Sequence, residues 1–199
     1  FSMNARTYIV RTLICTLLVS LAVLGLNWVV DPYAITGAPR IAHLNRYKAD
    51  INDYTRLMKK YQPAHAQHNT LILGNSRAEM GLDPAHRCFT GAGMDVYNLA
   101  MPGADVRTQL AYGLNLIYQQ PIEQVFLSVD FIDFISTEVQ PQRTENLLAV
   151  TRGEMKYLPS GKPAPAYWQT LALDYYKSLY SLDALVSSVK TVGLQGERA

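Results

Sequence analysis

The 199-residue sequence has few charged residues and only two cysteines. Charged residues make up 17% of the chain, below the share of about a quarter that is usual for soluble domains. The apolar share of 49% excludes an intrinsically disordered chain. With a net charge of only +2, the composition does not indicate nucleic-acid binding. Cys15 and Cys88 lie in unlike surroundings, so we expect unpaired thiols and no disulfide framework.

The longest uncharged apolar run extends from Thr12 to Val30. At about 1.5 Å per residue, a helix over this run spans roughly 28 Å, close to the thickness of a bilayer's hydrocarbon core. Arg6 and Arg11 precede the run, so the positive-inside rule places the N-terminus in the cytoplasm. The sequence therefore predicts a single-pass protein of the inner (cytoplasmic) membrane that contacts lipid through residues 9–30. The bulk of the chain is expected to be extracytoplasmic, which means periplasmic in a Gram-negative cell.

A cleaved signal peptide and a buried core helix are the alternatives to an anchor. A signal peptide has a shorter apolar core and a small residue on each side of its cleavage site. Here the run ends in Asn27-Trp28-Val29-Val30-Asp31-Pro32, which is a poor cleavage site. A core helix would not be expected to follow two arginines with so long an uncharged stretch. An uncleaved anchor is therefore the preferred interpretation.

Beyond the anchor, short apolar runs alternate with helical patterns. Three runs are predicted strands: Thr70–Leu73, Asp95–Leu99 and Gln124–Asp130. The order strand, helix, strand, helix, strand is typical of βαβ units and predicts an α/β fold with a parallel sheet. We divide the chain into an N-terminus with anchor helix (1–33), a juxtamembrane linker with an amphipathic helix (34–66), an α/β core (67–139), and a loop excursion followed by a helical segment (140–199).

Apolar spacing predicts which faces of the helices are buried. A helix from Arg46 to Tyr61 is expected to have a solvated face with Arg56, Lys59 and Lys60. A helix capped by Asp105 is expected to bury Val106, Leu110, Leu114 and Ile117. Ala166 to Val189 is predicted to form one long helix or two shorter ones, because apolar and aromatic residues recur there at helical spacing: Tyr167, Leu171, Tyr175, Leu179, Leu182, Leu185, Val186 and Val189.

Ser76 is the strongest candidate for a reactive residue. Gly74-Asn75-Ser76 makes a sharp turn after a predicted buried strand, which would expose the serine hydroxyl at the sheet edge. Met101-Pro102-Gly103 and Asp130 follow the other two strands, and ligands of parallel sheets bind at this carboxyl edge. A serine that only caps a short helix fits the same spacing. Arg77 is expected to pair with an acidic side chain such as Glu79 or Asp105.

Three segments, LILGNSRAEMGLDP, VYNLAMPGA and VFLSVDFIDF, resemble the SGNH (GDSL-like) hydrolase superfamily over about residues 68–135. The resemblance is to its membrane-anchored, extracytoplasmic branch, which includes proteins of exopolysaccharide and cell-wall O-acylation. It implies a three-layer, flavodoxin-like domain, incomplete at the C-terminus, with Ser76 as nucleophile and the N–H groups of Ser76 and Gly103 as the oxyanion hole. Asn75 replaces the usual Asp. The Gly-x-Asn-Asp block is absent, so Asp130 either takes part in an altered site or caps the next turn.

The resemblance also implies an Asp-x-x-His motif near the end of the domain, and the only histidine after Ser76 is His86. Asp83-Pro84-Ala85-His86 has that spacing but the wrong chain order, and Asp83 as a helix cap explains it locally. The site is therefore degenerate, or the chain is the first part of a longer protein, which we favour. No cofactor is implied, and no metal site is expected because His65 and His68 have no acidic or cysteine partner in sequence.

Two functions follow as hypotheses. The first is a membrane-anchored esterase or O-acyltransferase that acts on a cell-envelope glycan ester through Ser76. The second is a non-catalytic accessory subunit, whose degenerate domain caps a larger integral membrane protein or complex. Fold analogy does not decide between the two.

Overall fold

The computed structural model describes residues 4–131 and 154–197. The predicted loop excursion up to residue 153 lies outside the described residues. Contacts divide the chain into two compact units. Unit 1 consists of the described residues of Phe1–Tyr54 and Leu173–Ala199, and unit 2 consists of those of Thr55–Ala172. Each unit is described by itself.

Unit 1 is built on helix α1, Ala5–Val30. Of the described helices, α1 alone is long and apolar enough to cross a membrane. Its apolar side chains face outward: Leu13, Leu17 and Leu18 are each about three-fifths exposed. A core helix of a soluble protein buries such side chains, so the core-helix alternative is wrong.

Near its C-terminal end α1 buries Asn27 and Val30 within unit 1, whereas Trp28 and Val29 are exposed. Asp31 ends the helix in the left-handed conformation (φ 48°) and its N–H donates to the Asn27 carbonyl. The Asp31 carboxylate accepts hydrogen bonds from the backbone N–H groups of Ile35 (2.9 Å) and Thr36 (3.1 Å). The chain therefore turns sharply where the apolar run stops.

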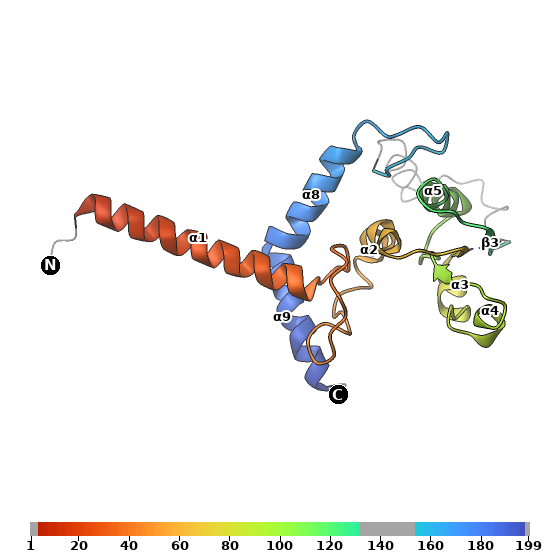
Figure 1. The fold of residues 1–199 in the computed structure, drawn as a ribbon, viewed down its shortest axis with the longest axis horizontal. Coiled ribbons are helices and arrows are strands. Elements are labelled where there is room, and N and C mark those ends of the chain that lie inside the picture. Colours follow the sequence, from red (N-terminus) through yellow and green to blue (C-terminus); the bar gives the residue numbers. More distant parts are fainter. Residues whose placement is uncertain (1–3, 132–153, 198–199) are drawn as a thin grey trace. The chain divides into compact units, whose positions relative to one another are not determined.

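Two helices, α8 (Tyr167–Tyr180) and α9 (Leu182–Glu197), account for the C-terminal helical pattern. They are separated at Ser181, whose hydroxyl accepts from the N–H of Ala184 at 3.0 Å. Helix α9 packs across the C-terminal end of α1 (Figure 1). The predicted helical segment thus forms two helices, but three of its regularly spaced apolar residues on α9, Leu182, Val186 and Val189, are exposed. The face that α9 buries is small and polar: Ala184, Ser187, Ser188, Thr191 and Gln195.

Unit 2 contains a parallel sheet of three strands in the described part of the chain. Strand β1 is Thr70–Leu73, β2 is Val96–Asn98 and β3 is Gln124–Leu127, in the order β2-β1-β3. Thr70 pairs with Val96 on one side and with Gln124 on the other. The predicted α/β fold with a parallel sheet is confirmed, and β2 and β3 are shorter than predicted.

Helices cover both faces of this sheet. The side chains of β1 alternate between the two faces, so each helical layer packs against different residues of this strand. Leu73 packs with Tyr112 of α5 (Val106–Ile117). Ile72 packs on the other face with Ala78 of α3 (Ser76–Gly81), and Phe89 of α4 (Arg87–Thr90) packs against the same cluster. Figure 1 shows α5 on one side of the sheet and α3 and α4 on the other. Unit 2 therefore has three layers.

Two predictions about helices in unit 2 need correction. Helix α2 is only Thr55–Tyr61, followed by the 3-10 turn η1 (Gln62–His65), and residues 46–54 form turns. Asp105 does cap α5, accepting from the Thr108 N–H at 2.9 Å. The face that α5 buries is nevertheless not the predicted one: Leu110 is exposed, and the buried residues are Thr108, Gln109, Ala111, Tyr112, Gly113, Asn115 and Leu116.

Candidate functional site at the carboxyl edge of the sheet

The backbone brings the three predicted segments together beyond the carboxyl ends of the strands. The N–H of Met101 donates to the Gly74 carbonyl at 2.9 Å, and the N–H of Ser128 donates to the Leu73 carbonyl at 2.8 Å. The turn after β1 therefore lies between the segment that follows β2 and the segment that follows β3. This is the juxtaposition that a parallel sheet imposes on such segments.

Gly74 is the residue that lets α3 approach the sheet. A Cβ atom at this position would lie 2.4 Å from the Cβ of Ala78 and 3.0 Å from the Cβ of Ser128. Both neighbours are the first side-chain atoms of their residues, so neither moves without its backbone. The glycine thus allows close packing, and it places the next two residues at the sheet edge.

Asn75 and Ser76 begin α3 and have different environments. The Asn75 side chain caps the helix, accepting from the Arg77 N–H at 2.9 Å, and it donates to Asp130 Oδ2 at 3.3 Å. Ser76 is the first residue of the helix and is partly exposed. Its hydroxyl has no hydrogen-bond partner among the described residues, so it is free to meet a ligand.

Asp130 holds the end of β3 to the start of α3. Its Oδ2 pairs with the Arg77 guanidinium at 2.7 Å as well as with Asn75. The predicted pairing of Arg77 with an acidic side chain is confirmed, but the partner is Asp130 and not Glu79 or Asp105. Glu79 instead faces Lys59 at 3.6 Å. Asp130 contacts the residues on either side of Ser76, which gives it a positioning role, and its assignment as a catalytic residue stays a prediction.

Gly103 lies in the turn after β2 with φ +65°, a conformation that glycine adopts without strain. It is exposed, and its N–H donates to no described group. An oxyanion needs such an unoccupied donor. The role of Gly103 beside Ser76 stays a prediction.

The described histidines do not form a hydrogen bond with Ser76. His86 Nδ1 accepts from the N–H of Cys88 at 3.2 Å and so caps α4. His68 Nδ1 lies 3.0 Å from Asp95 Oδ1. Asp83 does not cap a helix as predicted: its carboxylate accepts from the Ala85 N–H at 2.9 Å within a turn. The described residues also contain no cluster of His, Cys, Asp or Glu that could hold a metal ion.

A buried lysine supports the candidate site and was missed by the sequence patterns. Lys59, predicted to be solvated, is buried, and its Nζ donates to the Asn98 carbonyl at 2.6 Å. Burial lowers the pKa of Lys59, and the nearby Glu79 opposes this shift. The Asn98 amide in turn donates to three carbonyl groups, those of Ala78, Glu79 and Leu82. Together these contacts tie α3 to β2. Hydrophobic spacing alone gives no signal for them.

Comparison with known proteins gives no match to this chain. No family model matches it, and neither the curated proteins nor the solved structures contain a match. The resemblance to SGNH hydrolases therefore stays a prediction from the three sequence segments.

Proposed function

We propose that this chain is a membrane-anchored, extracytoplasmic SGNH-like esterase or O-acyltransferase that acts on a cell-envelope glycan ester. The observation that carries the proposal is the Ser76 hydroxyl, which has no hydrogen-bond partner in the described part of the chain. Ser76 lies two residues after Gly74, a glycine that the close packing of α3 on the sheet requires. The strand order β2-β1-β3 also supports it, because flavodoxin-like sheets arrange their first three strands in this order.

The end of α1 supports an uncleaved anchor rather than a signal peptide. Asn27 is fully buried, donates to the Leu179 carbonyl at 2.9 Å and accepts from the Ser188 hydroxyl at 2.7 Å. The Lys48 ammonium donates to the carbonyl of Val30, the last residue of the helix. Cleavage near the end of the apolar run would separate this buried network from the helix. Arg6 and Arg11 then favour a cytoplasmic N-terminus.

The proposed chemistry is acyl transfer through Ser76. Ser76 Oγ attacks the ester carbonyl, the bond between Oγ and the acyl carbon forms, and the C–O bond to the alcohol breaks. The N–H groups of Ser76 and Gly103 would stabilise the oxyanion. The proton of Ser76 passes to a base and then to the leaving alcohol. Water in an esterase, or an acceptor alcohol in a transferase, then attacks the acyl carbon, the bond to Oγ breaks, and the attacking group's proton returns through the base to Oγ. Since no described histidine is hydrogen-bonded to Ser76, we place that base outside the described residues.

Covalent labelling by a fluorophosphonate probe tests this proposal on the membrane-extracted, full-length native protein. We expect labelling that disappears in Ser76→Ala and persists in Ser128→Ala, a matched control that removes a partly exposed hydroxyl from the same sheet edge. Hydrolysis of p-nitrophenyl acetate should likewise be lost in Ser76→Ala and persist in Ser128→Ala. If the native protein is not labelled and Ser76→Ala changes nothing, the enzyme proposal is wrong.

The exposed strand β3 favours a second candidate, the non-catalytic accessory subunit. Val125, Phe126 and Leu127 are each about two-fifths exposed, and β3 lies at the edge of the sheet that the described residues form. An apolar edge strand is a surface on which another chain can pair. This candidate predicts co-purification with an integral membrane protein in fixed stoichiometry after mild detergent extraction. A purely monomeric detergent complex would exclude it.

A further inference from the structure

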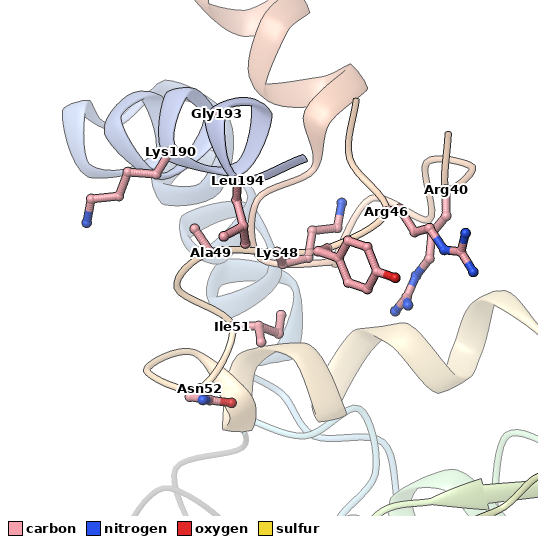
Figure 2. A pocket seen from close by; sticks show the side chains of 10 residues that line it. Arg40, Arg46, Lys48, Ala49, Ile51, Asn52, Lys190, Gly193 and Leu194 are labelled. Carbon is pink, nitrogen blue, oxygen red and sulfur yellow. The ribbon is translucent and has the colours of Figure 1, made fainter. Parts of the chain in front are cut away.

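Unit 1 contains a cavity of about 690 Å³ between the loop that follows α1 and helix α9. Its wall is formed by residues of segment 40–52 and by Lys190, Gly193 and Leu194 of α9. Figure 2 shows Arg40, Arg46 and Lys48 on one side of α9, whereas the Lys190 ammonium points away from the two arginines. A volume of this size is within the range of small-molecule sites.

The charge of the cavity wall has one sign. Four of the lining residues are basic, namely Arg40, Arg46, Lys48 and Lys190, and the lining includes no acidic residue. Lys190 is partly neutralised by Asp50 at 3.3 Å. Neither Arg40 nor Arg46 has a carboxylate partner among the residues that the structure describes. Such a concentration of cations repels itself and attracts an anion.

The cavity wall is held in place by hydrogen bonds between the loop and α9. The Gln195 side chain accepts from the Tyr47 N–H at 3.1 Å and donates to the Tyr47 carbonyl at 2.7 Å. The Ala49 N–H donates to Thr191 Oγ1 at 3.1 Å. The Arg46 guanidinium lies over the Tyr47 ring, 5.6 Å from its centroid. The backbone that presents the cations is therefore ordered before a ligand binds, which lowers the cost of binding.

One wall residue places the cavity directly beside the end of the apolar helix. Lys48 Nζ donates to the Val30 carbonyl at 2.5 Å, and the Asn45 side chain donates to the Val29 carbonyl at 2.8 Å. With α1 inserted, these carbonyl groups lie where the hydrocarbon core gives way to the headgroup region. Phosphate is the anion of that region. The guanidinium group of a single arginine can bind a phosphate by two parallel hydrogen bonds.

We propose that this cavity, with Arg40, Arg46 and Lys48, binds the phosphate group of an anionic lipid headgroup. A soluble phosphate compound would present the same chemistry to these three cations. The lipid source depends on the proposed membrane anchor, whereas the phosphate site itself does not.

The experiment uses the full chain in detergent and compares three probes: short-chain phosphatidylglycerol, phosphatidylcholine and inorganic phosphate. Native mass spectrometry measures the bound lipid, and calorimetric titration measures the bound phosphate. We expect phosphatidylglycerol to be retained in preference to phosphatidylcholine. Arg40→Gln/Arg46→Gln should weaken this binding about tenfold or more, because it removes two charge-assisted contacts.

Arg87→Gln/Arg107→Gln is the charge-matched control, since both residues are exposed and lie in unit 2. It should leave the preference unchanged. If inorganic phosphate binds with the same dependence on Arg40 and Arg46, and phosphatidylglycerol is not preferred, the site takes a soluble phosphate and the lipid source is wrong. If the native chain prefers neither probe, or if both double variants lose binding equally, the site itself is refuted. Failure of the membrane-anchor proposal would be recognised by a separate result: the chain would be extracted from cells without detergent.

Discussion

Replacing Gly74 by alanine should move α3 and with it Ser76. The added Cβ would be placed 2.4 Å from the Cβ of Ala78, where unstrained carbon atoms are about 3.5–4.0 Å apart. Ala78 is buried on α3, and the second close atom, the Cβ of Ser128, follows β3 at 3.0 Å. Relief therefore requires the helix backbone to shift by more than an ångström away from the sheet.

Overpacking of a rigid contact costs about 1–3 kcal/mol, and we expect the upper part of this range because neither neighbour can rotate away. For a domain of this size that corresponds to a fall of roughly 5–15 °C in the melting temperature. Gly81→Ala supplies the matched control in the same helix, because a Cβ atom there meets nothing within 4 Å. It should change stability by less than about 1 kcal/mol, in the stabilising direction.

The two variants are compared by thermal unfolding in detergent, monitored as the loss of the helical circular dichroism signal. The double variant Gly74→Ala/Ala78→Gly removes the closest atom, so it should be more stable than the sum of the single changes predicts. Labelling of Ser76 by fluorophosphonate should fall in Gly74→Ala and remain in Gly81→Ala. Equal melting temperatures for Gly74→Ala and Gly81→Ala would refute the packing argument.

Three further predictions concern polar groups. Asn98→Ala removes the amide that bonds three carbonyl groups around α3, and we expect a loss of about 1–3 kcal/mol in denaturant unfolding; a neutral result would contradict this role. Asn27→Ala breaks two buried hydrogen bonds at the end of α1, so amide hydrogen exchange should accelerate in α9 and stay unchanged in β1. Burial lowers the pKa of Lys48 to about 8, with Asp31 opposing and Arg40 adding to the shift. Phosphate binding should therefore weaken as the pH is raised through 8, and a flat pH profile would show that Lys48 does not contribute. The effect of pH on folding stability without a bound anion has the opposite direction. The folded chain binds the Lys48 proton more weakly than the unfolded chain, so the free energy of unfolding of unit 1 increases as the pH rises above 8.

The sequence predicted those features that apolar patterns and caps determine. The exposed apolar helix, strand β1 and the cap at Asp105 follow from residues within a few positions of one another. The meeting of Gly74 with the segments after β2 and β3 could be predicted as well, because parallel strands end at the same edge.

Burial of polar side chains could not be predicted from the same patterns. Helix α9 buries Ser188 and Thr191 because hydroxyl groups pair with Asn27 and with the Ala49 N–H, partners more than a hundred residues away. Lys59 is buried for a similar reason, since its charge meets a carbonyl on β2 and a carboxylate on α3. Hydrophobic spacing predicts that such residues are exposed to solvent, because the spacing contains no information about hydrogen bonds that form only in the tertiary fold.

The hydrogen-bonded end of α1 has a mechanical consequence if α1 is the membrane anchor that we propose. A domain on a flexible linker explores a volume whose radius grows with the square root of the linker length. Here the carbonyl groups of Val29 and Val30 are held by Asn45 and Lys48, and Asp31 fixes the first turn beyond the helix. With α1 inserted, segment 31–52 and α9 would stay at one height above the bilayer, and rotation of α1 about its own axis would sweep them around it. Unit 1 would thus reach only molecules that come to that height.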